Sequence, residues 1–401
     1  MVHFTLNVFT LKKHLKEKNK SDIKTINNMN MLFLLSLLIS QGFCSKFPPI
    51  TVVHLDVKKD FHAVGDGYTN DTPVIQKAIN LIVDSGGGFL YLPAGTYLLN
   101  RTINIPNVPI TIAGDGVSVS KLIWQDSNIG FNISQNTDQD AIVIRDLSLH
   151  TTGLSNGSAI AISLTGEVST GNVVQNRANP RINLHNLDIR GIVEENVGWN
   201  GCIYLSNGLH SVINQVGCIG ARDTNFIPIS EFAYKLDGNG SPVEINFNQV
   251  WAFFTQHAVS ISGNVERVSI TQANFVDVNY GILINTTVLQ AGFSMSSTQI
   301  NAYKNCINAV NMNQMDINNN IMYINNPNPG SFLMSIKNSA SNVIMGNQFL
   351  DISNTNLHTV LHLQNVANTI VSNNVCIANF LHFIDNPNNI SNTIEGNKCV
   401  V

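Results

Sequence analysis

The stretch that decides the fold runs from Ala63 to Tyr97 and reads AVGDGYTNDTPVIQKAINLIVDSGGGFLYLPAGTY. It places a turn, one short amphipathic helix, three consecutive glycines and an aromatic strand in that order. Asp71 or Thr72 is suited to the N-cap of the helix, and Pro73 to its first turn. One apolar stripe along this helix is formed by Val74, Ile75, Ala78, Ile79 and Ile82. The glycines at 86–88 end the helix and permit a sharp entry into the strand FLYLP.

The rest of the chain has the composition of strands and turns. Of its 401 residues, 44% are hydrophobic and only 12% are charged, about half the charged share of an ordinary globular domain. Asparagine, serine, threonine, valine and isoleucine are plentiful downstream, whereas long Lys/Glu/Ala runs are missing. This composition favours strands joined by turns over helices.

The N-terminal segment is treated separately. Residues 32–39, LFLLSLLI, are too few to span a bilayer. A lysine-bearing region precedes them and small residues follow, which is the layout of a secretory signal cleaved near Gly42 to Ser45. We therefore expect a leader at 1–44, a β-helix domain at 45–401, and a secreted or periplasmic location. An N-terminal membrane anchor is the alternative.

Charge and cysteine content narrow the range of partners. Residues 1–44 carry six lysines against two acids, so the remainder of the chain has a net charge near −8. No basic tract remains, which argues against nucleic acid as a partner, and no membrane partner is expected after cleavage. The remaining cysteines are scattered and include no CxxC pair. They are interpreted as small buried side chains, and a Cys202–Cys218 bridge is left open.

One pattern recurs from about residue 140 onward. An apolar residue is followed five positions later by another, with small or amide side chains between them. The starts are separated by intervals of 22 to 34 residues, and they are Leu184, Ile213, Phe247, Ile270, Met295, Ile317, Ile344, Ile370 and Ile394. A period in the twenties carried by short strands indicates a solenoid.

Among solenoids, the leucine-rich repeat is disfavoured because its L-x-x-L-x-L spacing is missing. The alternation of apolar residues with asparagine fits an all-β, single-stranded right-handed parallel β-helix, in which inward side chains stack and asparagines form ladders at turns. A β-sandwich is the remaining alternative. Because a solenoid leaves an apolar end exposed, the short helix is predicted to be its N-terminal cap, with residues 60–125 forming the cap and first coils.

The same opening stretch resembles a known family signature. Gly65-Asp66-Gly67, Asn70-Asp71-Thr72, the run from Ile75 to Ile79, the glycines at 86–88 and Leu92-Pro93-Ala94-Gly95-Thr96-Tyr97 are similar to the N-terminal motif of the pectin-lyase-like superfamily. They are nearest to its rhamnogalacturonase/epimerase-like "pectate lyase 3" domain. The resemblance implies a right-handed parallel β-helix that acts on, or binds, extracellular polysaccharide. Within that signature Asp66 and Asp71 are read as turn and cap residues.

The chemistry that such a scaffold performs requires charged groups in its wide loops. Hydrolysis of a glycosidic bond needs two carboxylates that flank it. Elimination across a uronic acid needs a base for the proton beside the carboxylate, together with a cation to neutralise that carboxylate. The two longest intervals, Leu184–Ile213 and Ile213–Phe247, are expected to place loops on one flank of the solenoid.

These loops and the next coil supply the candidate residues. The catalytic candidates are Glu194, Glu195, Asp223, Glu231, Asp237 and His257. The substrate-binding candidates are Arg190, Trp199, Arg222, Tyr234 and Lys235. Each has a structural alternative: a solvated glutamate pair, an Arg222–Asp223 ion pair that closes a turn, a turn-forming Asp237, a turn histidine at 257, or a packed Trp199.

Two functions from different classes follow. The first is a secreted enzyme that cleaves a polysaccharide in a groove, with hydrolysis slightly preferred because carboxylates outnumber cations in the candidate loops. The second is a non-catalytic glycan-binding protein of the tailspike or adhesin type. The candidate loops contain no dense aspartate cluster of the kind that a calcium site needs, and no metal or cofactor is predicted. The partner is a polysaccharide, and the protein is expected to be a monomer or a homotrimer.

Overall fold

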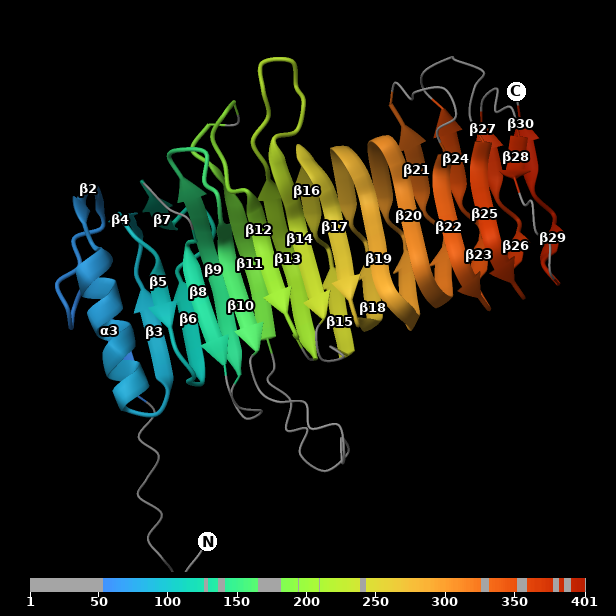
Figure 1. Ribbon diagram of the computed structural model, residues 1–401. Coiled ribbons are helices and arrows are strands. Elements are labelled where there is room, and N and C mark those ends of the chain that lie inside the picture. The colour runs from blue at the N-terminus through green and yellow to red at the C-terminus, as the bar shows by residue number, and fades with distance from the viewer. Residues whose placement is uncertain are drawn as a thin grey trace, which may run out of the picture. The chain divides into compact units, whose positions relative to one another are not determined.

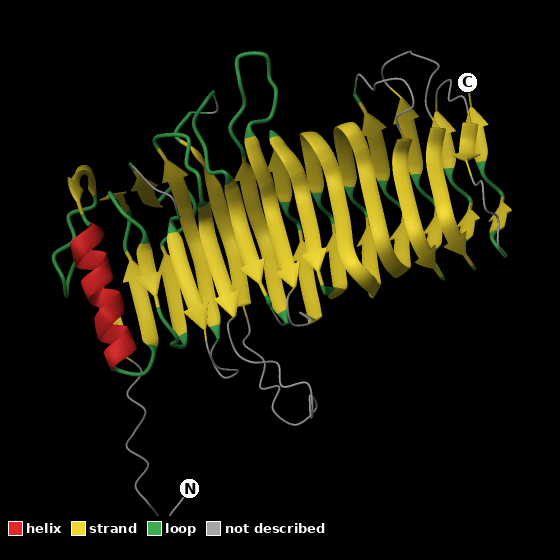
Figure 2. Cartoon of the chain, viewed as in Figure 1, coloured by secondary structure: helices red, strands yellow, loops and turns green. Residues whose placement is uncertain are grey.

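The computed structural model is a right-handed parallel β-helix (Figure 1). It describes residues 53–125, 129–135, 141–164, 182–193, 195–208, 210–238, 243–325, 332–351, 359–377, 382–385 and 391–400. The predicted leader at 1–44 lies outside these residues. The unit from Val52 to Val401 is a rod of stacked coils with helix α3 (Thr72–Asp84) at its N-terminal end (Figure 2). The predicted fold class is therefore confirmed.

Each coil crosses three faces of the rod, and every strand pairs in parallel with its equivalent in the next coil. The first face is built from β1 (Val53–Asp56), β3 (Gly88–Leu92), β6 (Ile110–Gly114), β15 (Val243–Asn248), β18 (Glu266–Thr271), β23 (Val343–Met345), β26 (Ile370–Ser372) and β29 (Thr393–Glu395).

The second face follows the first along the chain. It is built from β2 (Asp66–Asn70), β4 (Gly95–Leu99), β7 (Ser120–Trp124), β16 (Trp251–Phe253), β21 (Ile321–Ile324), β24 (Gln348–Asp351), β27 (Val375–Ile377) and β30 (Lys398–Val400).

The third face completes each coil. It is built from β5 (Ile103–Ile105), β8 (Phe131–Gln135), β10 (Ser158–Leu164), β12 (Gly201–Ser206), β14 (Ser230–Gly238), β17 (Thr255–Gly263), β22 (Phe332–Ala340), β25 (Thr359–Ala367) and β28 (His382–Asp385).

Five longer strands turn a corner and belong to more than one face. The first and second faces share β9 (Ile142–Thr151), β11 (Ile182–Gly191) and β13 (Ser211–Ile219). All three faces share β19 (Asn274–Ser296) and β20 (Gln299–Asn318).

Helix α3 covers the first coil as predicted. Its buried side chains are Thr72, Ile75, Ala78, Ile79 and Ile82, and Val74 is partly buried against the same core. Asp71 stands at the N-cap position, but its side chain makes no capping bond. Its carboxylate instead accepts hydrogen bonds from the backbone amides of Val64 (2.8 Å) and Gly65 (2.9 Å), so it holds the turn before the helix. Strand β1 adds a rung before the predicted first strand, because it pairs with β3.

The predicted coil anchors stack on one another inside the first face. Leu184, Ile213, Phe247, Ile270, Met295, Ile317 and Ile344 are in direct register and buried. The prediction is wrong by one residue at Ile370, which is 44% exposed. Val371 takes the inward position, in register with Ile344 and Ile394, because adjacent strand residues point to opposite sides.

A column of left-handed residues turns the chain from the first face to the second. Ten register-equivalent positions have φ between 50° and 67°, and they are Asp146, Asn186, Gln215, Gln249, Gln272, Ser297, Asn319, Gly346, Asn373 and Gly396. Asparagine, aspartate and glycine are the residues that most readily adopt this conformation. The corner therefore explains the recurring amide residues of the sequence.

The position after this column changes character along the rod. It holds buried apolar residues in the earlier coils, such as Leu187 and Val216, and then a ladder of Asn320, Asn347, Asn374 and Asn397. Asn347 donates from Nδ2 to the Ile317 carbonyl (2.8 Å) and to Asn374 Oδ1 (3.0 Å). Its Oδ1 accepts from the Asn320 amide (3.0 Å). The predicted asparagine ladder is therefore present, and it satisfies backbone groups inside the core.

The cysteines differ from the prediction. Cys202 and Cys218 form a disulfide, with Cα atoms 6.0 Å apart, so the bridge that the sequence left open exists. Cys376 and Cys399 form a second disulfide between register partners in successive coils. The interpretation as unpaired buried side chains is thus wrong for these four, while Cys306 is free and buried. Among the described residues, no helix is long and apolar enough to cross a membrane.

Replacing Asn347 by leucine is expected to destabilise the rod. The change leaves the Asn320 amide and the Ile317 carbonyl buried without their partner, which costs about 2–4 kcal/mol. Asn246→Ala is the control, because Asn246 is exposed on β15 and such changes stay within about 0.5 kcal/mol. The urea midpoint followed by circular dichroism measures both. Equal midpoints for the two variants would contradict a structural role for the ladder.

Candidate functional site

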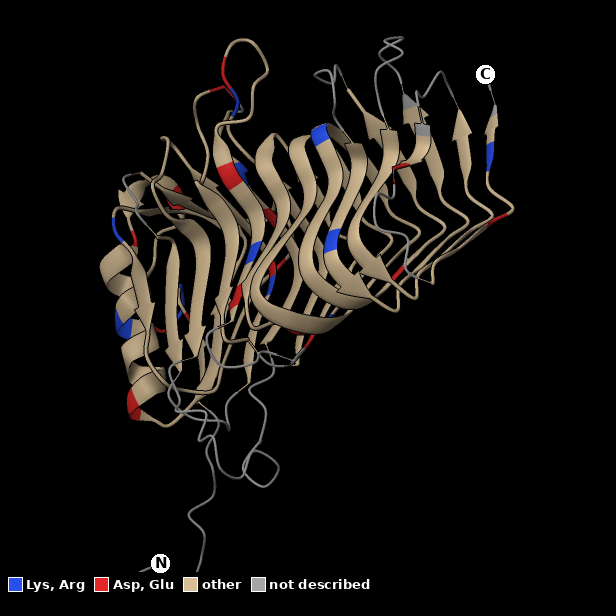
Figure 3. Ribbon diagram, turned by 45° about the vertical axis from the view of Figure 1, so that its right-hand side comes forward, with Lys and Arg blue, Asp and Glu red and all other residues tan. Residues whose placement is uncertain are grey.

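Three loops lie side by side where the second face turns into the third. They span 152–157, 192–200 without residue 194, and 220–229, and together we call them the loop crest (Figure 1). Parallel bridges join Leu154 to Gly198 and Glu195 to Arg222, so the crest extends the coil register outward. The two long intervals thus place loops on one flank, as predicted. The loop at 220–229 is the tallest of the three, and we call it the tall loop. Figure 3 shows charged residues scattered thinly over the rod, with both signs on the tall loop.

Two predicted residues organise the tall loop. The Asp223 carboxylate accepts hydrogen bonds from the amides of Asn225 and Ile227, both at 2.8 Å. The Arg222 guanidinium lies between two aromatic rings, 4.0 Å from the centre of Phe226 and 4.6 Å from that of Phe254. These contacts stabilise the loop. Asp223 therefore serves as a turn-forming residue.

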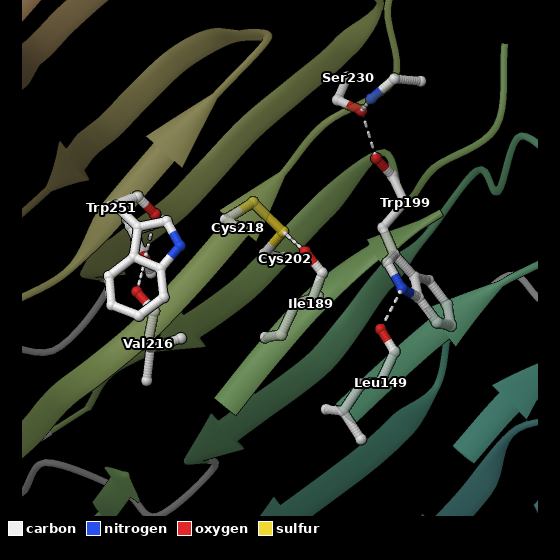
Figure 4. The surroundings of a disulfide bond; sticks show 10 residues. Leu149, Ile189, Trp199, Cys202, Val216, Cys218, Ser230 and Trp251 are labelled. Carbon is white, nitrogen blue, oxygen red and sulfur yellow. Dashed lines mark hydrogen bonds between the residues drawn. A yellow bond between two sulfur atoms is a disulfide. The ribbon is translucent and has the colours of Figure 1, made fainter. Parts of the chain in front are cut away.

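Two predicted sugar-binding aromatics are core residues instead. Trp199 is 1% exposed and donates from Nε1 to the Leu149 carbonyl at 3.2 Å (Figure 4). Tyr234 is fully buried, and its hydroxyl donates to the Val216 carbonyl at 2.7 Å. Neither ring can stack on a ligand, so both predictions are wrong. The physical reason is that the one polar atom of each side chain donates to a backbone carbonyl, so the ring can be buried without an unsatisfied donor.

The outer side of the third face brings together the remaining predicted groups. Phe232, His257 and Tyr280 are register partners in successive coils. The rings of His257 and Tyr280 have centroids 5.4 Å apart, and the Lys304 ammonium lies 5.4 Å from the centre of the Tyr280 ring. A base, a phenol and a cation therefore follow one another along the rod. We call Glu231, Lys235, His257, Tyr280 and Lys304 the third-face cluster.

Lys235 lies on the other side of His257. Its ammonium lies 3.4 Å from Glu231 Oε1 and 5.3 Å from the centre of the Phe232 ring. The second Glu231 oxygen accepts a hydrogen bond from Asn200 at 3.1 Å. Phe232 is itself packed over Gly201, where a Cβ would lie 2.1 Å from the ring. Lys235 is thus held over a stable apolar platform at the edge of the cluster.

The surroundings of His257 favour its neutral form. Burial lowers the pKa of His257 below its usual 6.5, and the charges of Lys235 and Lys304 lower it further, while Glu231 opposes them. An imidazole with a lowered pKa is unprotonated at neutral pH. It can therefore accept a proton.

The two candidate carboxylates on β14 are too far apart to flank one bond. Glu231 and Asp237 lie six residues apart on the same strand, a separation of roughly 20 Å at about 3.3 Å per residue. Asp237 contacts Tyr204 (3.3 Å) and Ser262 (3.3 Å), and Asp223 is engaged within its own turn. Glu195 lies on the crest beside Arg222. Glu194 lies outside the described residues.

Arg190 lies away from the third-face cluster, on the outer side of the second face. Its Nε is 3.0 Å from Asp188 Oδ2, and the same oxygen is 3.1 Å from His150 Nε2. Within the described ranges, no group of three His, Cys, Asp or Glu residues is arranged to hold a metal ion.

Four residues of these two groups escaped the sequence reasoning: Tyr280, Lys304, His150 and Asp188. Tyr280 follows His257 by 23 residues, and Lys304 follows Tyr280 by 24. Tyr280 and Lys304 could have been found by counting the coil period onward from His257. His150 and Asp188 lie on strands rather than in loops, and a search confined to long loops could not reach them.

Comparison with known proteins is informative about the family. Residues 55–282 match the family model described as rhamnogalacturonase A/epimerase, pectate lyase-like. Alginate lyase 7 from Azotobacter vinelandii is 40% identical over 91 residues, which are 20% of this chain and 11% of that protein. Mannuronan C5-epimerase AlgE2 from the same organism is 45% identical over 74 residues, 16% of this chain and 7% of that protein. The chain thus matches only a small part of these relatives' length.

Solved structures support the same fold. The A-module of Azotobacter vinelandii mannuronan C-5 epimerase AlgE4 superposes with a TM-score of 0.62 at 15% identity, covering 86% of this chain and 97% of that one. The AlgE6 A-module gives a TM-score of 0.56 at 11% identity, covering 86% and 99%. At these identities the likeness establishes the parallel β-helix alone.

The pKa of His257 is expected to follow its charged neighbours. Glu231→Gln removes the group that opposes the shift, so it should lower the pKa of His257 further. Lys304→Met should raise it. Imidazole resonances titrated by NMR and assigned with His257→Gln measure both shifts. His362, which pairs with Asp385 at 2.9 Å in a distant coil, is the internal control. An unchanged His257 pKa in both variants would show that these charges do not reach the ring.

Proposed function

Because the chain belongs to the rhamnogalacturonase A/epimerase, pectate lyase-like family, we propose that it acts on a polysaccharide at the third-face cluster. The reaction is removal of the proton beside the carboxylate of a uronic acid residue, as in elimination or epimerisation. The observation that carries the proposal is the neutral His257, set between two ammonium groups and next to the Tyr280 ring.

The roles follow from the chemistry of that proton. It is only weakly acidic while the neighbouring carboxylate keeps its charge, so Lys235 and Lys304 neutralise the carboxylate and stabilise the negative charge that develops. His257 accepts the proton, because its lowered pKa leaves the ring nitrogen free. The Tyr280 hydroxyl donates a proton, either to the departing sugar oxygen in elimination or to the opposite side of the carbon in epimerisation.

The names of the relatives agree with this chemistry. Alginate lyase 7 and mannuronan C5-epimerase AlgE2 are named for elimination and epimerisation on uronic acid polymers. Since the matches cover only a small part of those proteins, the choice between the two reactions stays with the experiment. Export of the chain by its N-terminal segment is part of the proposal, because structural polysaccharides lie outside the cell.

Hydrolysis, which the sequence slightly favoured, ranks second. An acid and a base or nucleophile should lie about 5–5.5 Å or 6.5–9.5 Å apart, and the described carboxylates Glu231 and Asp237 are much farther apart than that. A glycan-binding protein without catalysis is the other alternative. It shares the third-face surface but needs no base.

His257→Gln is expected to lower kcat/KM by at least 100-fold on the best substrate of a uronic acid polymer panel, because general-base catalysis contributes about 10²–10⁴-fold. Absorbance of the unsaturated product reports elimination, and deuterium incorporation from D2O reports epimerisation. His362→Gln is the matched control on the outer third face and should leave the rate unchanged.

The same panel is read for new reducing ends without unsaturation, which would identify hydrolysis and refute the proposed proton abstraction. Binding of a polymer without any of the three signals would identify a glycan-binding protein instead. Equal activity of His257→Gln and the unmodified protein would remove His257 from the mechanism.

A further inference from the structure

The outer second face carries a carboxylate held in a fixed position. Asp188 Oδ2 lies 3.0 Å from Arg190 Nε and 3.1 Å from His150 Nε2. The side chains of Asp188 and His150 are only 13% and 10% exposed, whereas that of Arg190 is 40% exposed. Because its neighbours Leu187 and Ile189 point into the core, the Asp188 carboxylate points outward from the strand.

An aromatic ring lies on the same face as this carboxylate, two coils farther along the rod. Asp188, Gly217 and Trp251 are register partners in three successive coils. A Cβ on Gly217 would lie 2.1 Å from Trp251 Nε1 and 2.3 Å from Cε2, so the indole occupies the space above the glycine backbone. Figure 4 shows this ring against β13, on the other side of the Cys202–Cys218 disulfide from Trp199. Trp251 is thus two rungs, about 10 Å, from Asp188 along the sheet, and its indole leans over the glycine that lies between them.

Trp251 differs from the other tryptophans in its exposure. The sequence contains three, and Trp124 and Trp199 are buried in the core. Trp251 is only partly buried, and its backbone carbonyl accepts a hydrogen bond from the buried Tyr234 hydroxyl at 3.0 Å. The backbone of Trp251 is thus anchored by the core, and the residue stays partly exposed to solvent.

We propose that Asp188, Arg190 and Trp251 form a glycan-binding subsite on the second face, separate from the third-face cluster. The ligand is a pyranose residue of a glycan chain. Its C–H face stacks on the indole, since aromatic side chains combine apolar area with a rigid shape. Its hydroxyls donate to Asp188 and accept from Arg190, and a charged partner strengthens both kinds of hydrogen bond. His150 holds Asp188 in place as a positioning residue.

The chain contains a natural control for a purely structural ion cluster. His210 Nδ1 lies 2.6 Å from Glu244 Oε2, and Arg267 Nη1 lies 3.0 Å from Glu244 Oε1. This cluster has the same three kinds of group, and among the described residues no aromatic ring contacts His210 or Arg267. If substitution of Asp188 weakens glycan binding and substitution of Glu244 does not, the Asp188 cluster is a binding subsite and not only a surface ion pair.

Intrinsic fluorescence gives a direct readout. Acrylamide should quench Trp251 in preference to the two buried tryptophans. Hexasaccharides of mannuronate, galacturonate, cellulose and xylan are the probes. At least one should reduce the quenching constant about twofold or more in the His257→Gln variant, which prevents turnover under the proposed function. Asp188→Asn should lower the affinity for that ligand about tenfold or more, and Glu244→Gln should leave the affinity unchanged within about twofold.

Trp251→Ala is followed by calorimetry, because it removes the fluorescent reporter, and it should abolish the calorimetric signal of the second-face subsite. Thermal melts show whether each variant is folded. Protection by none of the four probes, or equal weakening by Asp188→Asn and Glu244→Gln, overturns the subsite. Undiminished turnover in His257→Gln together with Asp188-dependent protection would refute the proposed function and leave the subsite standing.

Discussion

The whole molecule depends on parallel hydrogen bonding between each coil and the next. In this arrangement a residue is paired with its equivalent one coil later, about 4.8 Å away. Leu184, Ile213 and Phe247 therefore rest on one another inside the first face, and the same constraint stacks every outward residue on its equivalent. A single coil buries too little apolar surface to be stable, so the stacking supplies both the core and the surface of the rod.

This constraint explains how much of the fold the sequence could predict. The cap helix was predictable because its apolar stripe follows a 3.6-residue period, and Ile75, Ala78 and Ile79 are indeed buried. The one-residue error at Ile370 arose because Ile370 and Val371 are both β-branched and apolar, so composition alone did not fix which one points inward. The Cys376–Cys399 disulfide joins residues 23 positions apart, which is one coil. It became visible only once the register was known.

The site was harder to predict than the fold. Glu231, Lys235 and His257 were found because charged residues are scarce in this chain, but their partners Tyr280 and Lys304 lie in short coils without loops. Trp199 and Tyr234 were misplaced because a tryptophan in a long loop and a tyrosine among charged residues both look exposed. Burial of those rings is decided by the stacking of neighbouring coils, and that information lies in residues 17 to 50 positions away, such as Trp251 for Tyr234 and Leu149 for Trp199.

Under the proposed function, the weakness of one ion pair lets the third-face cluster respond to a ligand. Lys235 and Glu231 are 3.4 Å apart, with side chains 30% and 48% exposed, and such pairs contribute roughly 0–1 kcal/mol. Exchanging this partner for a ligand carboxylate therefore costs little. Glu231 also favours the charged form of His257, so an ammonium group that turned from Glu231 toward a ligand would leave two negative charges near the ring. The cluster is thus electrostatically coupled, and a bound carboxylate would make the His257 nitrogen more basic at the point where a base is required.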